Sequence, residues 1–400
     1  MYIFLFTRDL RIHDNTALNA AIREAVKTNE KILPVFIMNP KQMTKENPLY
    51  NPHSVSFMIG CLKELDAELR QLGTTLHVIY ATLEKATEEL ARIVDGSKRI
   101  FLNEDLTDFA RHRVELLRSH QFDVTETRDL FLMGSTVDRP YFMFTSYWNR
   151  MWQNRRHIKA TGCPRNRAVF AKLGLSKPFM SIADFEACSE LALIPGRKEA
   201  LKRITRINSS YSNDVIDGGS NLSVYLKFGC VSSREVWTKV SQRNTTKDFL
   251  RELTWRDFYL QVYDVEPQSF HRTGNGGGVH WTGTDAQFRQ WCEGRTEHPI
   301  INAAMHELSA TGQMPNRFRM LVACYLVKIL HIDWRKGERW FAKHLLDYDP
   351  IINNANWQWI AGISKGSRLM WSRVLSPEIQ TRKFDPDGSY REKWLPKKPI

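Results

Sequence analysis

The chain has 400 residues, which is long for one compact core, so we expect two domains. Hydrophobic residues make up 42% and charged residues 25%, and no apolar run approaches the roughly 20 residues of a membrane helix. The net charge is +13, but residues 1–128 hold 17 basic and 18 acidic side chains, which leaves net +14 for residues 129–400. The lack of a long apolar run predicts no membrane span, and the charge asymmetry indicates a polyanion partner for the second part.

The first 130 residues alternate short β-like runs with amphipathic stretches. The expected strands are Tyr2–Phe6, Ile32–Ile37, Thr75–Tyr80, Arg99–Leu102 and Asp123–Thr127. The expected helices are Thr16–Val26, Ser54–Leu72, Leu83–Val94 and Asp108–Ser119. Strand–helix alternation predicts an α/β domain with a Rossmann-like, mostly parallel sheet. The turn after the first strand lacks G-x-G-x-x-G, so a standard NAD site is not expected there.

Beyond this region the pattern changes. Residues 129–205 are less regular and read as an interdomain connector, and residues 206–400 are helical without renewed strand–helix alternation. We therefore predict an α/β domain over 1–128 and an all-α domain over 206–400. No two cysteines form a C-x-x-C pair, so no metal site is expected. Arg8 and Asp9 interrupt the apolar start too early for a secretory leader, which predicts an intracellular protein, cytoplasmic or nuclear.

Four segments between residues 218 and 359 combine residue types that are suited to binding a ligand. In 218–223, small and hydroxyl residues before a helix could bind a phosphate, although such a stretch is more often a helix N-cap. In 252–259, helical spacing puts Glu252, Trp255 and Arg256 on one face, which could grip a base or merely be a solvated face with an ion pair. Segment 314–320 pairs two arginines with a Phe, and alone it reads as an amphipathic helix start.

The fourth segment is the strongest indication of function. Residues 347–359 hold two acids, three Asn and two Trp, a density of hydrogen-bonding groups that a purely structural role does not easily explain. The chain as a whole is also rich in tryptophan, with ten of its twelve in residues 201–400. Because an indole N–H needs a partner in a core, so many indoles indicate either an aromatic helical core or stacking and redox roles.

Together these segments resemble the photolyase/cryptochrome family. The opening Phe6-Thr7-Arg8-Asp9-Leu10-Arg11, the run Asn103-Glu104-Asp105, the run Phe144-Thr145 with Tyr147-Trp148, and the closing Lys383-Phe384-Asp385-Pro386 are similar to family signatures in the same order. The resemblance covers nearly the whole chain. It implies an N-terminal antenna-type α/β domain and a helical domain that holds one FAD. The antenna chromophore stays open between a folate, a deazaflavin, a flavin and none.

The resemblance also implies roles for individual residues. Those expected to hold FAD are Tyr211, Ser220, Leu222, Ser223, Arg256, Asn316, Arg319, Asp347, Asp349 and Asn353. Asn353 would face flavin N5, where a neutral amide can serve either protonation state. Gly219 departs from the family pattern, which usually has Thr, so one phosphate contact is expected to be missing. An electron relay from flavin to surface would consist of Trp357, Trp334 and Trp291.

Within the family, the residues favour repair of cyclobutane pyrimidine dimers, of the class I or III kind. The expected lesion contacts are Glu252, Trp255, Asn316, Arg317, Met320 and Trp359. Enzymes for (6-4) photoproducts carry histidines around the position of Asn316, and the DASH branch often has Gln at the position of Met320. Both differences argue against these two branches. A blue-light receptor without repair remains the alternative from another class, and a damage-binding module a third. The implied enzyme is a monomeric carbon–carbon lyase that binds UV-damaged DNA, in which excited reduced FAD lends the dimer an electron and then recovers it.

Overall fold

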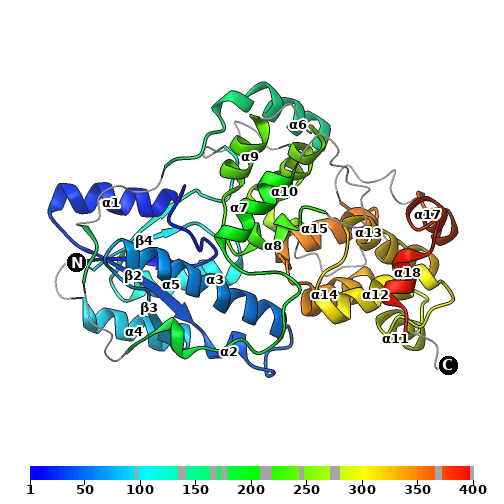
Figure 1. Ribbon diagram of the computed structural model, residues 1–400, viewed down its shortest axis with the longest axis horizontal. Coiled ribbons are helices and arrows are strands. Elements are labelled where there is room, and N and C mark those ends of the chain that lie inside the picture. The colour runs from blue at the N-terminus through cyan, green and yellow to red at the C-terminus, as the bar shows by residue number, and fades with distance from the viewer. Residues whose placement is uncertain are drawn as a thin grey trace. The chain divides into compact units, whose positions relative to one another are not determined.

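The computed structural model describes residues 1–94, 98–133, 141–162, 169–172, 178–207, 219–242, 247–270, 280–364 and 372–396. By contacts the chain divides into two compact units (Figure 1). The first contains residues 1–139, 152–208 and 221–245, and the second contains residues 140–151, 209–220 and 246–400. The contacts thus group residues 221–245 with the N-terminal region, while the domain boundaries expected at 128 and 205 stay a prediction.

The first unit is built on a six-stranded sheet. Its strands are β1 (Tyr2–Phe6), β2 (Ile32–Met38), β3 (His77–Tyr80), β4 (Arg99–Asn103), β5 (Asp123–Thr127) and β6 (Phe179–Met180). The strand order is β5-β4-β1-β2-β3-β6, and only β6 of the described strands pairs antiparallel, with β3. The expected Rossmann-like α/β fold is confirmed, and the edge strand β6 was not anticipated.

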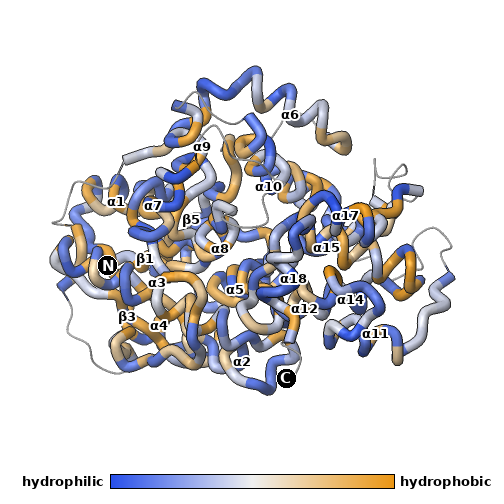
Figure 2. Tube along the Cα trace, turned by 45° about the vertical axis from the view of Figure 1, so that its right-hand side comes forward, coloured by the Kyte–Doolittle hydropathy of each residue, from blue (hydrophilic) through white to orange (hydrophobic). Residues whose placement is uncertain are grey.

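Helices cover both faces of this sheet. They are α1 (Thr16–Thr28), α3 (Pro52–Gln71), α4 (Leu83–Ile93) and α5 (Asp108–Ser119), and the short helix α2 (Pro40–Met43), which has no buried residue, follows β2. Ile3 and Leu5 of β1 share a buried cluster with α4 and α5, whereas Tyr2, on the opposite face, donates to Thr28 of α1 at 3.0 Å. In Figure 2 the chain around β1 and β3 is largely hydrophobic, as expected for strands buried on both faces.

A buried charge network holds the later part of this unit in place. This later part of the first unit contains η1 (Arg155–His157), η3 (Ile182–Asp184), α7 (Arg197–Arg206), α8 (Leu222–Lys227) and α9 (Ser233–Ser241). Arg234 of α9 pairs with Asp14 at 3.0 Å and with Asp129 at 2.7 Å, and Arg11 also pairs with Asp129. All four side chains are buried, so these bridges fix α9 against the segments that follow β1 and β5.

The second unit is helical wherever the structure describes it. Its elements are α6 (Phe144–Gln153, most of which lies in this unit), α10 (Lys247–Val265), η4 (Pro267–Ser269), α11 (Asp285–Cys292), α12 (Pro299–Thr311), α13 (Asn316–Cys324), the π-helical turn η5 (Tyr325–Ile329), α14 (Trp334–His344), α15 (Pro350–Ile360), α17 (Pro377–Phe384) and α18 (Ser389–Trp394). Helix α15 packs against α10, α13 and α14. The expected all-α character is confirmed. None of the described helices is long and apolar enough to cross a bilayer.

Candidate functional site

The amino end of α15 positions the segment that the sequence singled out. Asp349 is its N-cap and accepts hydrogen bonds from the backbone N–H groups of Ile351 at 3.0 Å and Ile352 at 3.1 Å, and Pro350 fills the first turn. This cap fixes where the helix starts. Asn353, Trp357 and Trp359 are thereby carried on a helix whose neighbours are α10, α13 and α14.

Arg319 and Asp347 form a two-point ion pair beside this helix. The guanidinium of Arg319 contacts the carboxylate through Nη1–Oδ1 and Nη2–Oδ2, each at 3.0 Å, and its Nε donates to the carbonyl of Met314 at 2.8 Å. Such a fork is planar and rigid. It presents a cation and an anion in one plane, which suits a flat heterocycle that has both acceptors and an N–H donor.

Asn353 is held by a residue that sequence reasoning missed. Its Nδ2 donates to Oε1 of Glu338 at 3.0 Å and to the Glu338 carbonyl at 3.3 Å. Burial raises the pKa of the Glu338 carboxyl, although the hydrogen bonds from Asn353 and Tyr348 lower it in part. Glu338 therefore uses the amide N–H group and leaves the amide oxygen outside these two hydrogen bonds. Glu338 lies one helical turn after Trp334, and this i+4 spacing is the sequence signal that could have identified Glu338 as a site residue.

Glu252 lies half-buried on α10, near Arg317 of α13. Burial raises the pKa of its carboxyl, the charges of Arg251 and Arg317 lower it, and Asp248 adds to the increase. Tyr259 lies on the same face of α10. Burial also raises the pKa of its hydroxyl, and the Glu252 charge adds to that shift. A carboxyl that keeps its proton to higher pH than usual can donate a hydrogen bond to a carbonyl oxygen.

The remaining expected lesion contacts are spread over three helices of the second unit. Trp255 on α10, Met320 on α13 and Trp359 on α15 are half-buried, and Asn316 is exposed at the start of α13. Arg317, also on α13, lies over the ring of Phe384 at 5.1 Å. Helices α10 and α13 pack against α15, so the elements that carry the expected lesion contacts and the expected ring contacts Arg256, Arg319 and Asn353 are neighbours.

Arg256, an expected flavin or adenine contact, is half-buried on α10. Of the expected phosphate contacts, Ser220 belongs to the second unit, whereas Leu222 and Ser223 begin α8 in the first. Asn221, before α8, has a left-handed backbone (φ 49°) and makes no side-chain cap, so the simple N-cap interpretation of this turn is wrong. Tyr211 lies outside the described residues.

Two of the three expected relay tryptophans have suitable environments. Trp357 and Trp334 are 2% and 6% exposed. Trp291 is 0% exposed, and its Nε1 donates to the carbonyl of Val322 at 3.0 Å. Its ring centroid lies 6.4 Å from that of Trp357. The relay was expected to end at the surface. Trp291 cannot be that end, because no part of its side chain reaches solvent.

Trp281 fits the outward position better. It is half-buried against the cluster that contains Trp334. The N–H of Gly283, two residues later, donates to the carbonyl of His331 at 3.1 Å, and a Cβ on Gly283 would collide with Ile332. Trp281 therefore belongs to a segment that runs beside the start of α14, and part of its indole is accessible.

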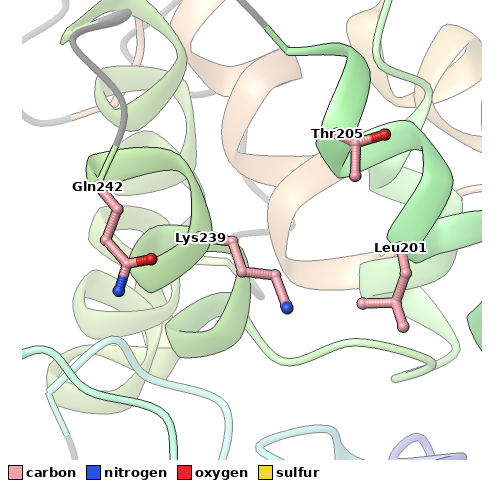
Figure 3. A pocket seen from close by; sticks show the side chains of 4 residues that line it. All are labelled: Leu201, Thr205, Lys239 and Gln242. Atoms are coloured by element: carbon pink, nitrogen blue, oxygen red, sulfur yellow. The ribbon is translucent and has the colours of Figure 1, made fainter.

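A pocket of about 280 Å³ lies elsewhere, between α7 and α9 of the first unit. Leu201 and Thr205 line it from α7, and Lys239 extends into it from α9 beside Gln242 (Figure 3). Among the described residues, none of the expected site residues lines this pocket, and Lys239 is the ionisable side chain that does. Among the residues that the structure describes, no group of His, Cys, Asp or Glu is placed to hold a metal ion.

Comparison with known proteins follows the same two-part division of the chain. The family model described as DNA photolyase matches residues 2–164, and the one described as FAD binding domain of DNA photolyase matches residues 249–398. A deoxyribodipyrimidine photo-lyase of Alkalihalophilus pseudofirmus is 31% identical, covering 98% of this chain and 86% of the relative. A Streptomyces griseus protein of the same name is 30% identical over 98% of this chain and 89% of its own length.

A solved structure agrees with these sequence relatives. The archaeal photolyase of Sulfolobus tokodaii, which was crystallised with two FAD molecules, superimposes with a TM-score of 0.86 at 34% identity. The match covers 98% of this chain and 90% of that one.

Proposed function

This chain belongs to the DNA photolyase family, and from that premise we propose that it is a deoxyribodipyrimidine photo-lyase that splits cyclobutane pyrimidine dimers in DNA with light. We assign it to the class I or III kind, acting as a monomer inside the cell. The observation that carries the proposal is the packing of α10, α13 and α14 against α15, because these helices carry the expected lesion contacts and the residues expected around the flavin ring.

The donor set of this cluster fits FAD. An isoalloxazine ring offers carbonyl acceptors, an N–H donor and a nitrogen, N5, that changes protonation state. The Arg319–Asp347 fork supplies a donor and an acceptor in one plane, and Asn353 supplies an amide that Glu338 orients. Arg256, Asp349 and Asn316 complete the proposed ring and adenine contacts, and Ser220, Leu222, Ser223 and Tyr211 the phosphate contacts. Bound reduced FAD supplies the light-driven one-electron chemistry.

The protein's own groups receive and orient the lesion. Glu252 is proposed to donate a hydrogen bond to a pyrimidine carbonyl, because burial favours its protonated form. Trp255 and Trp359 offer flat faces for the two splayed bases, and Met320 packs beside them. Arg317 and the net +14 of residues 129–400 supply charge for backbone phosphates. Asn316 and Arg317 stand where (6-4) enzymes carry histidines, which favours cyclobutane dimers.

The flavin has to be reduced before it can act, and the tryptophans are proposed to deliver the electron. Trp357 and Trp334 are buried, so they can pass an electron between indoles without exposing a radical to water. We assign the outward end to Trp281 and treat Trp291 as an internal indole that contacts Trp357. This assignment separates photoreduction from repair, since the relay is needed for the first only.

A second chromophore is supported at the carboxyl ends of β1 and β4. Strand order reverses direction there, and open α/β sheets bind ligands at such points. Arg113 of α5 is buried, and its Nε and Nη2 find no hydrogen-bond partner among the described residues. Burial lowers the pKa of this guanidinium, while the nearby Asp105 and Asp9 raise it. An absorption spectrum of the holoprotein distinguishes a folate, a deazaflavin, a second flavin and an empty antenna site.

The test is illumination of the purified protein, chemically reduced, with an oligonucleotide that contains one cyclobutane dimer. We expect light-dependent loss of the dimer and no loss in darkness. Binding of the dimer without loss would indicate a damage-binding module, and neither binding nor loss with intact photoreduction would indicate a receptor. Trp334→Phe should lose most photoreduction but keep repair after chemical reduction. Equal loss of both activities would contradict the relay.

A further inference from the structure

Phe144, the first residue of α6, lies flat against the expected lesion-stacking residue Trp255. The two ring centroids are 3.6 Å apart and the planes differ by 5°. The guanidinium of Arg251, one helical turn before Trp255 on α10, lies over the Phe144 ring, 5.4 Å from its centroid. A guanidinium and an indole therefore both contact this benzene ring, and all three residues belong to the second unit.

This geometry is unusual for a protein core. Aromatic side chains prefer offset or edge-to-face contacts, and Phe258 makes such contacts with both members of the stack, at 5.8 Å to Phe144 and 5.6 Å to Trp255. The flat pair at 3.6 Å instead has the spacing of stacked bases. Phe144 thus either occupies the place of a base on Trp255 or supports the indole from the opposite face.

The anchoring of Phe144 decides between these two roles. Three residues before it, the Tyr141 N–H donates to Oε1 of Gln261 at 2.8 Å, and Nε2 of Gln261 donates back to the Tyr141 carbonyl at 3.3 Å. Three residues after it, the Tyr147 hydroxyl donates to the carboxylate of Asp257. Gln261, Asp257 and Tyr147 are buried, so moving the segment that carries Phe144 away from α10 would leave these groups unpaired, at about 1–3 kcal/mol each.

Exposure points the same way. Phe144 is only 7% exposed, whereas Trp255 is half-buried and keeps part of its surface accessible. A ring that has to leave for every substrate would not be pinned on both sides by buried hydrogen bonds. A ring that holds its neighbour in one rotamer would be, because covering one face removes the alternative orientations of the indole.

We propose that Phe144 is a positioning residue that, backed by Arg251, supports Trp255 so that its opposite face stacks on a base of the flipped lesion. The inference deepens the proposed function and rests on it. Phe144 does not contact the substrate in this arrangement. It acts through the orientation of Trp255, so the arrangement assigns part of the lesion affinity to the start of α6.

The test compares Phe144→Leu with Phe144→Tyr in the FAD-loaded full chain, and Met143→Leu, an exposed neighbour, is the matched control. We expect Phe144→Leu to weaken binding of a dimer-containing oligonucleotide by about three- to tenfold, the range for loss of one aromatic pair. Binding of the undamaged oligonucleotide, FAD content and photoreduction should stay unchanged. Phe144→Tyr should restore the affinity, which a merely structural role in folding would not require.

Two results would overturn the inference. Tighter lesion binding by Phe144→Leu would show that Phe144 blocks the indole, and unchanged binding would show that it does not position Trp255. Repair by the wild-type chain is measured in parallel under light. If the wild type repairs and the variant binds normally, this inference fails and the proposed function stands. If the wild type does not repair while the variant binds the dimer more weakly, the proposed function fails and the positioning role stands.

Discussion

In the first unit, the carboxylates of Asp14 and Asp129 lie against the guanidinium groups of Arg11 and Arg234, and all four are buried. Burial alone would raise the pKa of Asp129, but the charges of Arg11 and then Arg234 lower it to about 2. In the second unit, the carboxyls of Glu252 and Glu338 are half-buried, and burial raises the pKa of both.

The two sets of carboxyl groups therefore differ in whether a buried guanidinium neutralises them. The paired network specifies one arrangement of β1, β5 and α9, because its opposite charges meet within the fold. Among the described residues, Glu252 and Glu338 lack such a pairing with a buried guanidinium, and carboxyls of this kind occur at functional sites, although burial also raises the pKa of Asp9 and Glu68 in the first unit. The contrast between these two sets of carboxyls predicts that mutating them has different consequences.

The largest effect is expected from breaking the network of the first unit. Asp129→Asn leaves two buried guanidinium groups without their shared carboxylate, so we expect the free energy of unfolding to fall by about 3–5 kcal/mol. Urea unfolding followed by circular dichroism measures this, with flavin absorbance followed separately. The control is Asp123→Asn, an exposed carboxylate paired with Arg99 at 3.1 Å, which should change stability by less than about 1 kcal/mol. Equal effects would contradict the contrast.

The same pair sets the direction of acid unfolding. Because the pKa of Asp129 is lower in the folded state than the roughly 3.9 of free Asp, its stabilisation is present above pH 4. It is lost as the pH falls through about 2. Wild-type stability should therefore decrease over this window more steeply than that of Asp129→Asn.

In the second unit, the relay assignment can be tested by comparing Trp281, which is half-buried, with Trp291, which is fully buried. Trp281→Phe should slow photoreduction by removing the accessible indole, and it should leave stability nearly unchanged because Trp281 is half-buried. Trp291→Phe removes a buried indole and its hydrogen bond to Val322, so it should cost about 1–3 kcal/mol of stability and slow photoreduction less. Flash photolysis and thermal unfolding measure the two effects. If Trp291→Phe slowed photoreduction more than Trp281→Phe, the original assignment of Trp291 would hold.

The fold was largely predictable because its signals are local. Strand–helix alternation predicted β1, β5 and α5 with the bounds that the structure shows, since a parallel sheet needs runs of apolar residues separated by amphipathic helices. The edge strand β6 was missed because two residues give no period. The grouping of residues 221–245 with the first unit depends on Arg234, whose partners lie more than 100 residues earlier.

The site was predictable as a set of residues and not as a geometry. Family resemblance supplied Asn353 and Trp255, but their neighbours Glu338 and Phe144 came from the packing of helices. The mistaken surface role of Trp291 has the same origin, because sequence does not report which of several indoles in one segment is buried. Exposure and long-range partners are tertiary properties, so they had to come from the structure.

A smaller effect is expected from the pH dependence of repair. Burial raises the pKa of Glu252, so its protonated, hydrogen-bond-donating form persists above the roughly 4.3 of free Glu and disappears as the pH rises through the raised value. Repair yield with reduced flavin should decrease across that range. Glu252→Gln keeps a neutral donor of the same shape, so its yield should be independent of pH there. Glu252→Ala should be low at every pH, and an unchanged profile in both variants would remove Glu252 from the mechanism.

The smallest effect concerns Gly219, in the turn expected to hold the FAD phosphates. Among the described residues, a Cβ at this position would meet no atom within 4 Å. Gly219→Thr can therefore be accommodated, and its hydroxyl would add one phosphate hydrogen bond. We expect FAD affinity to rise about two- to tenfold. Gly219→Val has the same shape without the hydroxyl, so quenching of FAD fluorescence should show the gain for Thr and not for Val, and an equal gain in both would assign it to backbone rigidity.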